Sequence, residues 1–251
     1  MSTAGFADHF SAVAADYASA RPEYPEALFA WIASIAPSRN AAWEAGCGSG
    51  QASRGLAAYF DRVHASEPSS AQIAQAHGPG NITFAVEPGE RCSLPDVSVD
   101  AVCVAQALHW FDRTAFFAQC MRVLEPGGVL VAWGYQDIEV PEPLAAANAA
   151  LQDEIRDDWP PERVLIDNAY AGFDWPFPAL EVPPFELQAQ WALPRLLGYF
   201  SSYSASKRCR EATGRDPVAN HAPALAAAWG DPDTTQTVRW PLFVHARRKD
   251  S

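Results

Sequence analysis

WEAGCGSG, residues 43–50, is the stretch around which the rest of the chain is organised. Three glycines alternate with other residues in it, and each of them weakens regular secondary structure, so packing alone does not explain their presence. The pattern predicts the end of a strand, a sharp turn that lets a ligand approach the backbone, and a helix from Gln51 to about Phe60. Unpaired N–H groups at the start of that helix would point at the ligand.

Strand-like and helix-like segments alternate on both sides of this turn. Helices are predicted at 6–17, 25–35, 69–77 and, capped by Asp112, up to residue 124, with further strands at 62–67, 82–86, 100–105 and 129–133. Such alternation implies right-handed βαβ units and a parallel sheet. Ligands of these folds bind at the carboxyl ends of the strands, beside the point where the strand order reverses.

The character of the chain changes after Gln136. Residues 137–181 are rich in proline and tryptophan, with one helical patch at 144–155, and are predicted to form an inserted cap. Alternating apolar residues predict strands at 185–191 and 238–246, paired as an antiparallel edge, with helices at 193–202, 204–213 and 223–229 between them. We expect four parts: N-terminal helices (1–39), a nucleotide-binding core (40–136), the cap (137–181) and the end of the sheet with its helices (182–251).

Charge and cysteine content exclude several classes of protein. The 251 residues carry a formal net charge of −12, and residues 247–249 form the one basic block, which argues against nucleic acid or an anionic membrane as the main partner. Five scattered cysteines without C-x-x-C spacing suggest neither a disulfide framework nor a zinc site, so no metal is expected. No signal peptide or membrane-spanning run is visible, and we expect a cytoplasmic protein.

Two acids beside the glycines indicate the kind of ligand. Gln51 stands where a dinucleotide fingerprint has its third glycine. Glu44, at the strand tip, would repel a pyrophosphate but could pair with an ammonium group. Glu67 follows Gly46 by 21 residues and fits an acid that accepts hydrogen bonds from a ribose diol. The predicted ligand is a nucleoside with a cationic, amino-acid-like arm.

These motifs carry a family resemblance. EAGCGSG (44–50), Glu67, the Gly89-Glu90 pair with LPDVSVD (94–100), AQALHWF (105–111) and LEPGG (124–128) resemble class I S-adenosylmethionine-dependent methyltransferases of the type-11 group over about residues 40–135. The opening segment 10–25 and residues 201–205 resemble, more loosely, the trans-aconitate methyltransferase-like subgroup. Cys92-Ser93 departs from the family, where Leu-Pro is usual, and Tyr203 stands where tryptophan is frequent.

The resemblance implies an α/β, Rossmann-like fold of seven strands, five parallel and two at an antiparallel edge, with helices on both faces. It also implies S-adenosylmethionine as cofactor, S-adenosylhomocysteine as product and a small-molecule acceptor. The residues that would contact the cofactor are Tyr17, Glu44, Gly46, Cys47, Gly48, Gly50, Glu67, Pro68, Gly89, Glu90, Ala105, Gln106 and Trp110. Trp110 is weighed against a role in the core, which its residue type favours slightly.

Three residues are candidates for catalysis. His109 follows a buried strand at the ligand edge and is a candidate base or substrate contact, weighed against a role in fixing the loop. Tyr203 could offer its hydroxyl to the acceptor, and Arg21 could bind a carboxylate in a bidentate manner. A base is needed only if the acceptor keeps its proton at neutral pH, so a carboxylate acceptor would need none.

Two other functions stay open. A nicotinamide-dependent oxidoreductase would share the fold but is disfavoured by Gln51 and Glu44. A cofactor-binding module without catalysis would keep the same acids and glycines and act through its cap.

Overall fold

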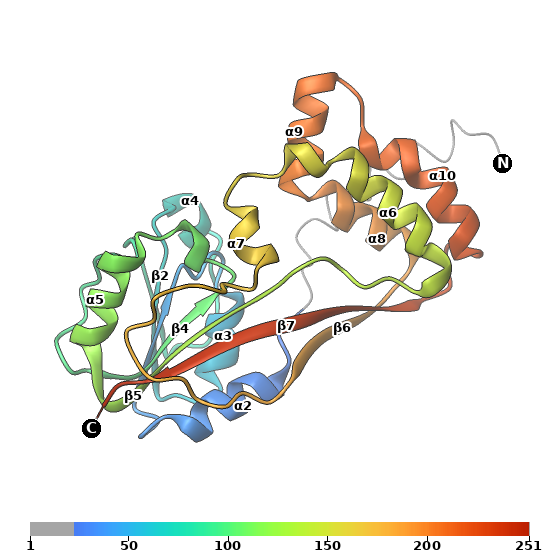
Figure 1. Ribbon diagram of the computed structural model, residues 1–251. Helices are drawn as coiled ribbons and strands as arrows, with labels where there is room; N and C mark the ends of the chain where they lie inside the picture. Colours follow the sequence, from blue (N-terminus) through green and yellow to red (C-terminus); the bar gives the residue numbers. More distant parts are fainter. Residues whose placement is uncertain (1–22, 251) are drawn as a thin grey trace. The chain divides into compact units, whose positions relative to one another are not determined.

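The computed structural model describes residues 23–250, and the helix predicted at 6–17 lies outside them. Seven strands form one sheet in the order β3-β2-β1-β4-β5-β7-β6 (Figure 1). Their bounds are Ala41–Ala45 (β1), Arg62–Ser66 (β2), Ile82–Ala85 (β3), Val99–Ala105 (β4), Leu124–Tyr135 (β5), Phe185–Trp191 (β6) and Gln236–Arg248 (β7). The first five strands pair in parallel, and β7 runs antiparallel to β5, which confirms the predicted fold class.

Strand β1 lies at the reversal of the strand order, because it pairs with β2 on one side and with β4 on the other. All five of its residues are buried. A strand with neighbours on both edges and helices on both faces has no surface in water, which is why apolar residues fill it. Glu44 is the exception, at the end where ligands bind in folds of this kind.

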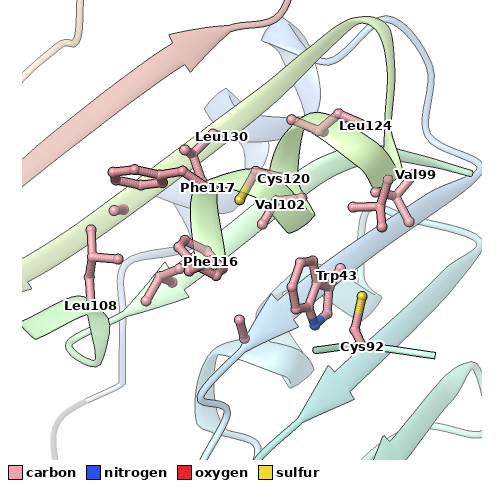
Figure 2. Packing of buried hydrophobic residues seen from close by; sticks show 14 of the residues in the cluster. Trp43, Cys92, Val99, Val102, Leu108, Phe116, Phe117, Cys120, Leu124 and Leu130 are labelled. Atoms are coloured by element: carbon pink, nitrogen blue, oxygen red, sulfur yellow. The ribbon is translucent and has the colours of Figure 1, made fainter. Parts of the chain in front are cut away.

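Successive side chains of each strand point to opposite faces of the sheet. Trp43, Val102 and Leu130 face helix α5 (Arg113–Val123), and Figure 2 shows them packed with Phe116, Phe117 and Cys120. Their neighbours in the sequence point the other way, into a second cluster that contains apolar residues of α2 (Glu26–Ile35) and α3 (Gln51–Ala57).

Hydrogen bonds fix the start of helix α5 and the start of β1. The Asp112 carboxylate caps α5 by accepting from the Ala115 N–H at 3.1 Å. Asp100, buried in β4, accepts from the Ser38 hydroxyl and from the backbone N–H groups of Asn40 and Ala41, at 2.7–3.0 Å. The amino end of β1 is therefore held against β4, which sets the position of the glycine turn at its other end.

Three predicted boundaries were wrong. α4 (Ser70–Ile73) is shorter than predicted because it buries no side chain that would sustain more turns. β5 begins at Leu124 rather than 129, since the LEPGG segment pairs with β4 across a register shift. α10 (Pro217–Trp229) begins six residues early and runs through Pro223, because Asp216 caps it and Pro217 suits the first turn of a helix.

The chain divides into two compact units. The sheet unit comprises residues 23–136, 164–187 and 241–250, and it includes α7 (Arg163–Asp167) apart from its first residue. The helical unit comprises 137–163 and 188–240 and contains α6 (Ala145–Glu154), α8 (Leu193–Ser201), α9 (Ser204–Thr213) and α10. The four-part division of the sequence stays a prediction. Among residues 23–250, no helix has the length and apolar character that a membrane span requires.

Candidate functional site

The glycine turn after β1 has the conformation that its sequence predicts. Gly46, Gly48 and Gly50 all have positive φ angles, of 71°, 56° and 84°, in the left-handed region that glycine adopts without steric cost. A Cβ atom at Gly46 would lie 2.7 Å from the Ala107 Cβ. The N–H groups of Gly46 and Cys47 donate to the Ser66 carbonyl at 2.8 and 3.0 Å, so the turn folds back onto the end of β2.

Glu67, at the end of β2, is joined to the same turn. One carboxylate oxygen accepts from the Gly48 N–H at 3.2 Å and the other from the Ser69 N–H at 3.0 Å. The side chain is buried, while Pro68 beside it is exposed. The structure thus brings together the predicted ribose acid and the second glycine of the turn.

Glu44 is a buried acid directly below the turn. It is 1% exposed, and one of its oxygens accepts a hydrogen bond from the Ser53 hydroxyl of α3. Burial raises the pKa of Glu44 to about 8, because no nearby cation offsets the loss of water strongly enough. A ligand cation placed here would compensate the carboxylate. Ser53 was missed in the sequence, because its contact with Glu44 forms only when α3 packs onto β1.

Cys47, between two of the glycines, contributes its backbone to the turn and does not supply a reactive thiol. Its side chain is buried, and burial together with the nearby Glu44 and Glu67 raises the pKa of the thiol well above its usual range. A thiol that stays protonated is a poor nucleophile.

Phe111 connects the loops after β1 and β3. A Cβ atom at Gly46 would lie 3.0 Å from its ring, and one at Gly89 would lie 2.8 Å away. The Glu90 carboxylate accepts from the Asp112 N–H at 2.8 Å, which ties the β3 loop to the start of α5. In the sequence Phe111 stands out only as part of a family motif, because the two glycines that leave room for its ring belong to other loops.

The loop around Cys92 is held from α5. The Arg122 guanidinium donates to the carbonyls of Leu94 and Cys92, at 2.6 and 3.2 Å, and pairs with Asp96. The family's Leu-Pro is therefore replaced by a segment whose shape arginine hydrogen bonds maintain.

Gln106 closes the carboxyl end of β4. Its φ angle is 54°, and its side-chain amide both donates to the Tyr135 carbonyl at 3.0 Å and accepts from the Tyr135 N–H at 2.8 Å. The side chain thus extends the β4–β5 ladder as a peptide group would. The role of Ala105 and Gln106 in binding a ligand stays a prediction.

His109 and Trp110 lie in η1 (Leu108–Trp110), the short helix after β4. The His109 Nδ1 atom is 3.1 Å from the Tyr170 hydroxyl oxygen. Trp110 is 59% exposed, so the slightly favoured expectation that it fills the core was wrong. Its ring lies 4.7 Å from that of His109, centroid to centroid, and the pair presents an aromatic surface at this edge.

The remaining predicted site residues belong to the helical unit or lie outside the described residues. Tyr203 belongs to the helical unit, where its ring lies 5.2 Å from that of Trp159 and 5.0 Å from that of Tyr199. Tyr17 and Arg21 lie outside the described residues. Within residues 23–250, no group of three or more histidine, cysteine or acidic side chains is arranged to hold a metal ion.

Comparisons with known proteins agree with this arrangement. The Methyltransf_11 family model, described as a methyltransferase domain, matches residues 43–132. A solved structure from Anaeromyxobacter dehalogenans, described as a "putative type II methyltransferase", is 45% identical, covers 93% of this chain and all of its own, and superposes with a TM-score of 0.89.

Curated proteins give the same family. A Dictyostelium discoideum protein, also named a "putative methyltransferase", is 29% identical over 98% of this chain and 96% of its own length. The 2-methyl-6-phytyl-1,4-hydroquinone methyltransferase of Synechocystis is 30% identical over 59% of this chain and 49% of its own. On the glycine turn, the two acids, the strand order and these relatives, the chain belongs to the class I S-adenosylmethionine-dependent methyltransferases.

Proposed function

We propose that the sheet unit binds S-adenosylmethionine at the ends of β1 to β4 and that the protein transfers its methyl group to a small molecule. The observation that carries the proposal is the arrangement of the two acids around one glycine turn. Glu67 receives the N–H of Gly48, and Glu44 lies buried below with its pKa raised to about 8. A nucleoside with a hydroxyl pair and an ammonium group complements both acids.

The residues present fit this cofactor. Glu44 would pair with the methionyl ammonium, which would offset the burial of its carboxylate. Glu67 would accept from the ribose hydroxyls, and the positive φ angles of the turn leave room for a ligand against the backbone. Gly89 and Glu90 would flank the adenine, while exposed Trp110 would cover one side of the ligand.

Bound S-adenosylmethionine would supply a methyl group already activated by its positively charged sulfur. The chain then has to orient the acceptor and exclude water, and orientation alone is worth at most about 7–11 kcal/mol. His109 is a side chain at this edge that can hydrogen-bond an acceptor. Tyr203 and Arg21 stay proposals for the acceptor side, and a carboxylate or hydroxyl is the proposed acceptor group.

We also propose that the protein works in a reducing compartment such as the cytoplasm. All five cysteines are free and buried, as expected for thiols that are never required to pair.

Glu67→Ala tests the ribose assignment. We expect S-adenosylhomocysteine to bind about 1–3 kcal/mol more weakly, because its hydroxyls lose a charged acceptor. Isothermal titration calorimetry with S-adenosylhomocysteine and with its 2′-deoxy analogue measures this. The wild-type protein should discriminate between the two ligands, and the variant should not.

The 2′-deoxy analogue separates two causes of a loss of affinity in Glu67→Ala. Glu67 also holds the Gly48 and Ser69 N–H groups, so the substitution loosens the turn as well. If Glu67→Ala weakened both ligands but still discriminated between them, Glu67 would only hold the loop. Unchanged affinity would remove Glu67 from the site altogether. Glu154→Ala, which removes a carboxylate of the helical unit, is the control and should leave affinity unchanged.

A further inference from the structure

Tyr170 is a tyrosine that packing holds in one position. It is 1% exposed, its ring stacks on that of Phe173 at 5.0 Å, and it meets the edge of Phe243 at 4.9 Å. Stacked and edge-to-face pairs are the favourable geometries of aromatic rings, so both neighbours stabilise this orientation of the Tyr170 ring. The hydroxyl at the far end of the ring is therefore placed as firmly as the ring.

The backbone under Tyr170 is strained. Ala169 and Tyr170 are consecutive residues other than glycine with φ angles of 48° and 56°, a sparsely populated conformation that is unfavourable for residues with a side chain. The Tyr170 N–H donates to the Leu165 carbonyl at 2.9 Å, and His245 Nε2 lies 2.7 Å from the Ala169 carbonyl and donates to it. Strain of this kind persists only where the surrounding contacts hold a residue in place. Here those contacts hold the Tyr170 hydroxyl in one position.

The buried Tyr170 hydroxyl needs an acceptor for its hydrogen, because a buried donor without a partner costs free energy. Burial raises the pKa of the phenol well above its usual range, so the proton stays on it. The His109 Nδ1 atom, 3.1 Å away, is the acceptor that the geometry provides. A hydroxyl that donates to Nδ1 requires that nitrogen to carry no proton.

We infer that Tyr170 holds the neutral His109 ring in the tautomer that carries its proton on Nε2. Nε2 is then a hydrogen-bond donor, and Nδ1 is occupied by the phenol. Tyr170 acts as a positioning residue, because it reaches the acceptor only through the histidine. The role of the Nε2 proton toward an acceptor rests on the proposed methyl transfer, whereas the tautomer itself does not.

With its proton on Nε2, His109 can fill only one of the two roles considered for it. A neutral imidazole with its proton on Nε2 cannot take a proton there, so His109 does not serve as the general base in this state. It can instead donate to a lone pair of the acceptor and so hold the reacting atom in line. The acceptor group that fits is one that bears a hydrogen-bond-accepting oxygen or nitrogen and needs no base from His109.

Nitrogen-15 NMR of the full chain, labelled at histidine, tests the tautomer. Spectra are recorded at pH 8.5, where an ordinary imidazole is neutral, and His109 is assigned by its loss in His109→Gln. We expect the coupling pattern of the Nε2–H form, with the Nδ1 resonance displaced by the accepted hydrogen bond. Tyr170→Phe, which keeps the ring, should abolish that displacement and raise the population of the other tautomer.

Two results would overturn the inference: a proton on Nδ1 in the wild-type protein, or an identical Nδ1 resonance in Tyr170→Phe. The wild-type spectrum decides even if the variant fails to fold. Tyr199→Phe is the matched control, because it removes another buried tyrosine hydroxyl, in the helical unit, and should leave His109 unchanged. Titration of the same samples with S-adenosylhomocysteine tests the proposed function separately, since the tautomer is recorded without ligand.

Discussion

Glu44→Gln is expected to raise the free energy of unfolding at pH 8 while it weakens the binding of S-adenosylhomocysteine. The carboxyl is 1% exposed, and burial raises its pKa from 4.5 to about 8. Glutamine keeps the shape and an oxygen for the Ser53 hydroxyl but never ionises. Stability and binding should therefore change in opposite directions, which a merely structural residue would not produce.

The sign of the pH dependence follows from the raised pKa. Between pH 4.5 and 8 the unfolded chain ionises Glu44 while the folded chain keeps it protonated, so the native state binds more protons and stability falls as the pH rises. The loss in the free energy of unfolding that the buried Glu44 causes is near zero below pH 4.5 and reaches at most about 5 kcal/mol above pH 8. Glu44→Gln should thus stabilise the protein strongly at pH 8 and little at pH 5.

Urea unfolding at the two pH values measures the stability, and calorimetry at pH 7 measures the binding. We expect affinity to fall by about 1.5–3 kcal/mol, the range for a hydrogen bond to a charged group. Asp100→Asn is the control for the stability change: it alters another buried acid whose oxygens receive three hydrogen bonds, and it should destabilise the protein at pH 8. A Glu44→Gln protein with unchanged affinity would refute the ammonium assignment.

Gly48→Val is expected to abolish binding of S-adenosylhomocysteine in a protein that still folds. Gly48 has a φ of 56°, so a side chain there costs about 1–2 kcal/mol in backbone strain. Its Cβ would meet the end of the flexible Gln72 side chain at 3.1 Å, which can move aside. The added branches would occupy the face of the turn that a ligand must approach.

Valine at Gly214 is the control, because it introduces the same backbone strain without obstructing the glycine turn. Gly214 has a φ of 69° and open space around its Cβ position, and it ends α9 in the helical unit. Gly214→Val should lose a similar amount of stability and keep full affinity. Circular dichroism verifies folding of both variants, and calorimetry compares them. If Gly48→Val bound the ligand as well as the wild-type protein does, the glycine turn would not be the binding site.

Local patterns predicted the sheet unit well because they are set by short-range chemistry. The spacing of the glycines in WEAGCGSG requires positive φ angles, and all three glycines have them. The two-residue alternation that predicted β6 and β7 arises because successive side chains of a strand point to opposite faces of the sheet. Where a start signal competes with a stop signal the sequence was harder to interpret, as at α10, where the Asp216 cap outweighs Pro223.

The parts of the site that the sequence did not predict depend on contacts between distant residues. Tyr170 meets His109 from 61 positions away, and Ser53 meets Glu44 only after the helix has folded onto β1. No local pattern marks such pairs. Phe111 likewise acquires its role from glycines of two different loops, Gly46 and Gly89.

Calorimetric titration of the wild-type protein with S-adenosylhomocysteine and, in parallel, with NAD tests the central claim most directly. Glu44 and the Gly46–Gly50 turn predict that the first ligand binds and that NAD does not. Binding at pH 7 should also release close to one proton, because a ligand ammonium would ionise Glu44, whose pKa is about 8 in the free protein. Titration in two buffers of different ionisation enthalpy measures that release. Binding of NAD alone, or of neither ligand, would contradict the assignment of this turn to a methyl donor.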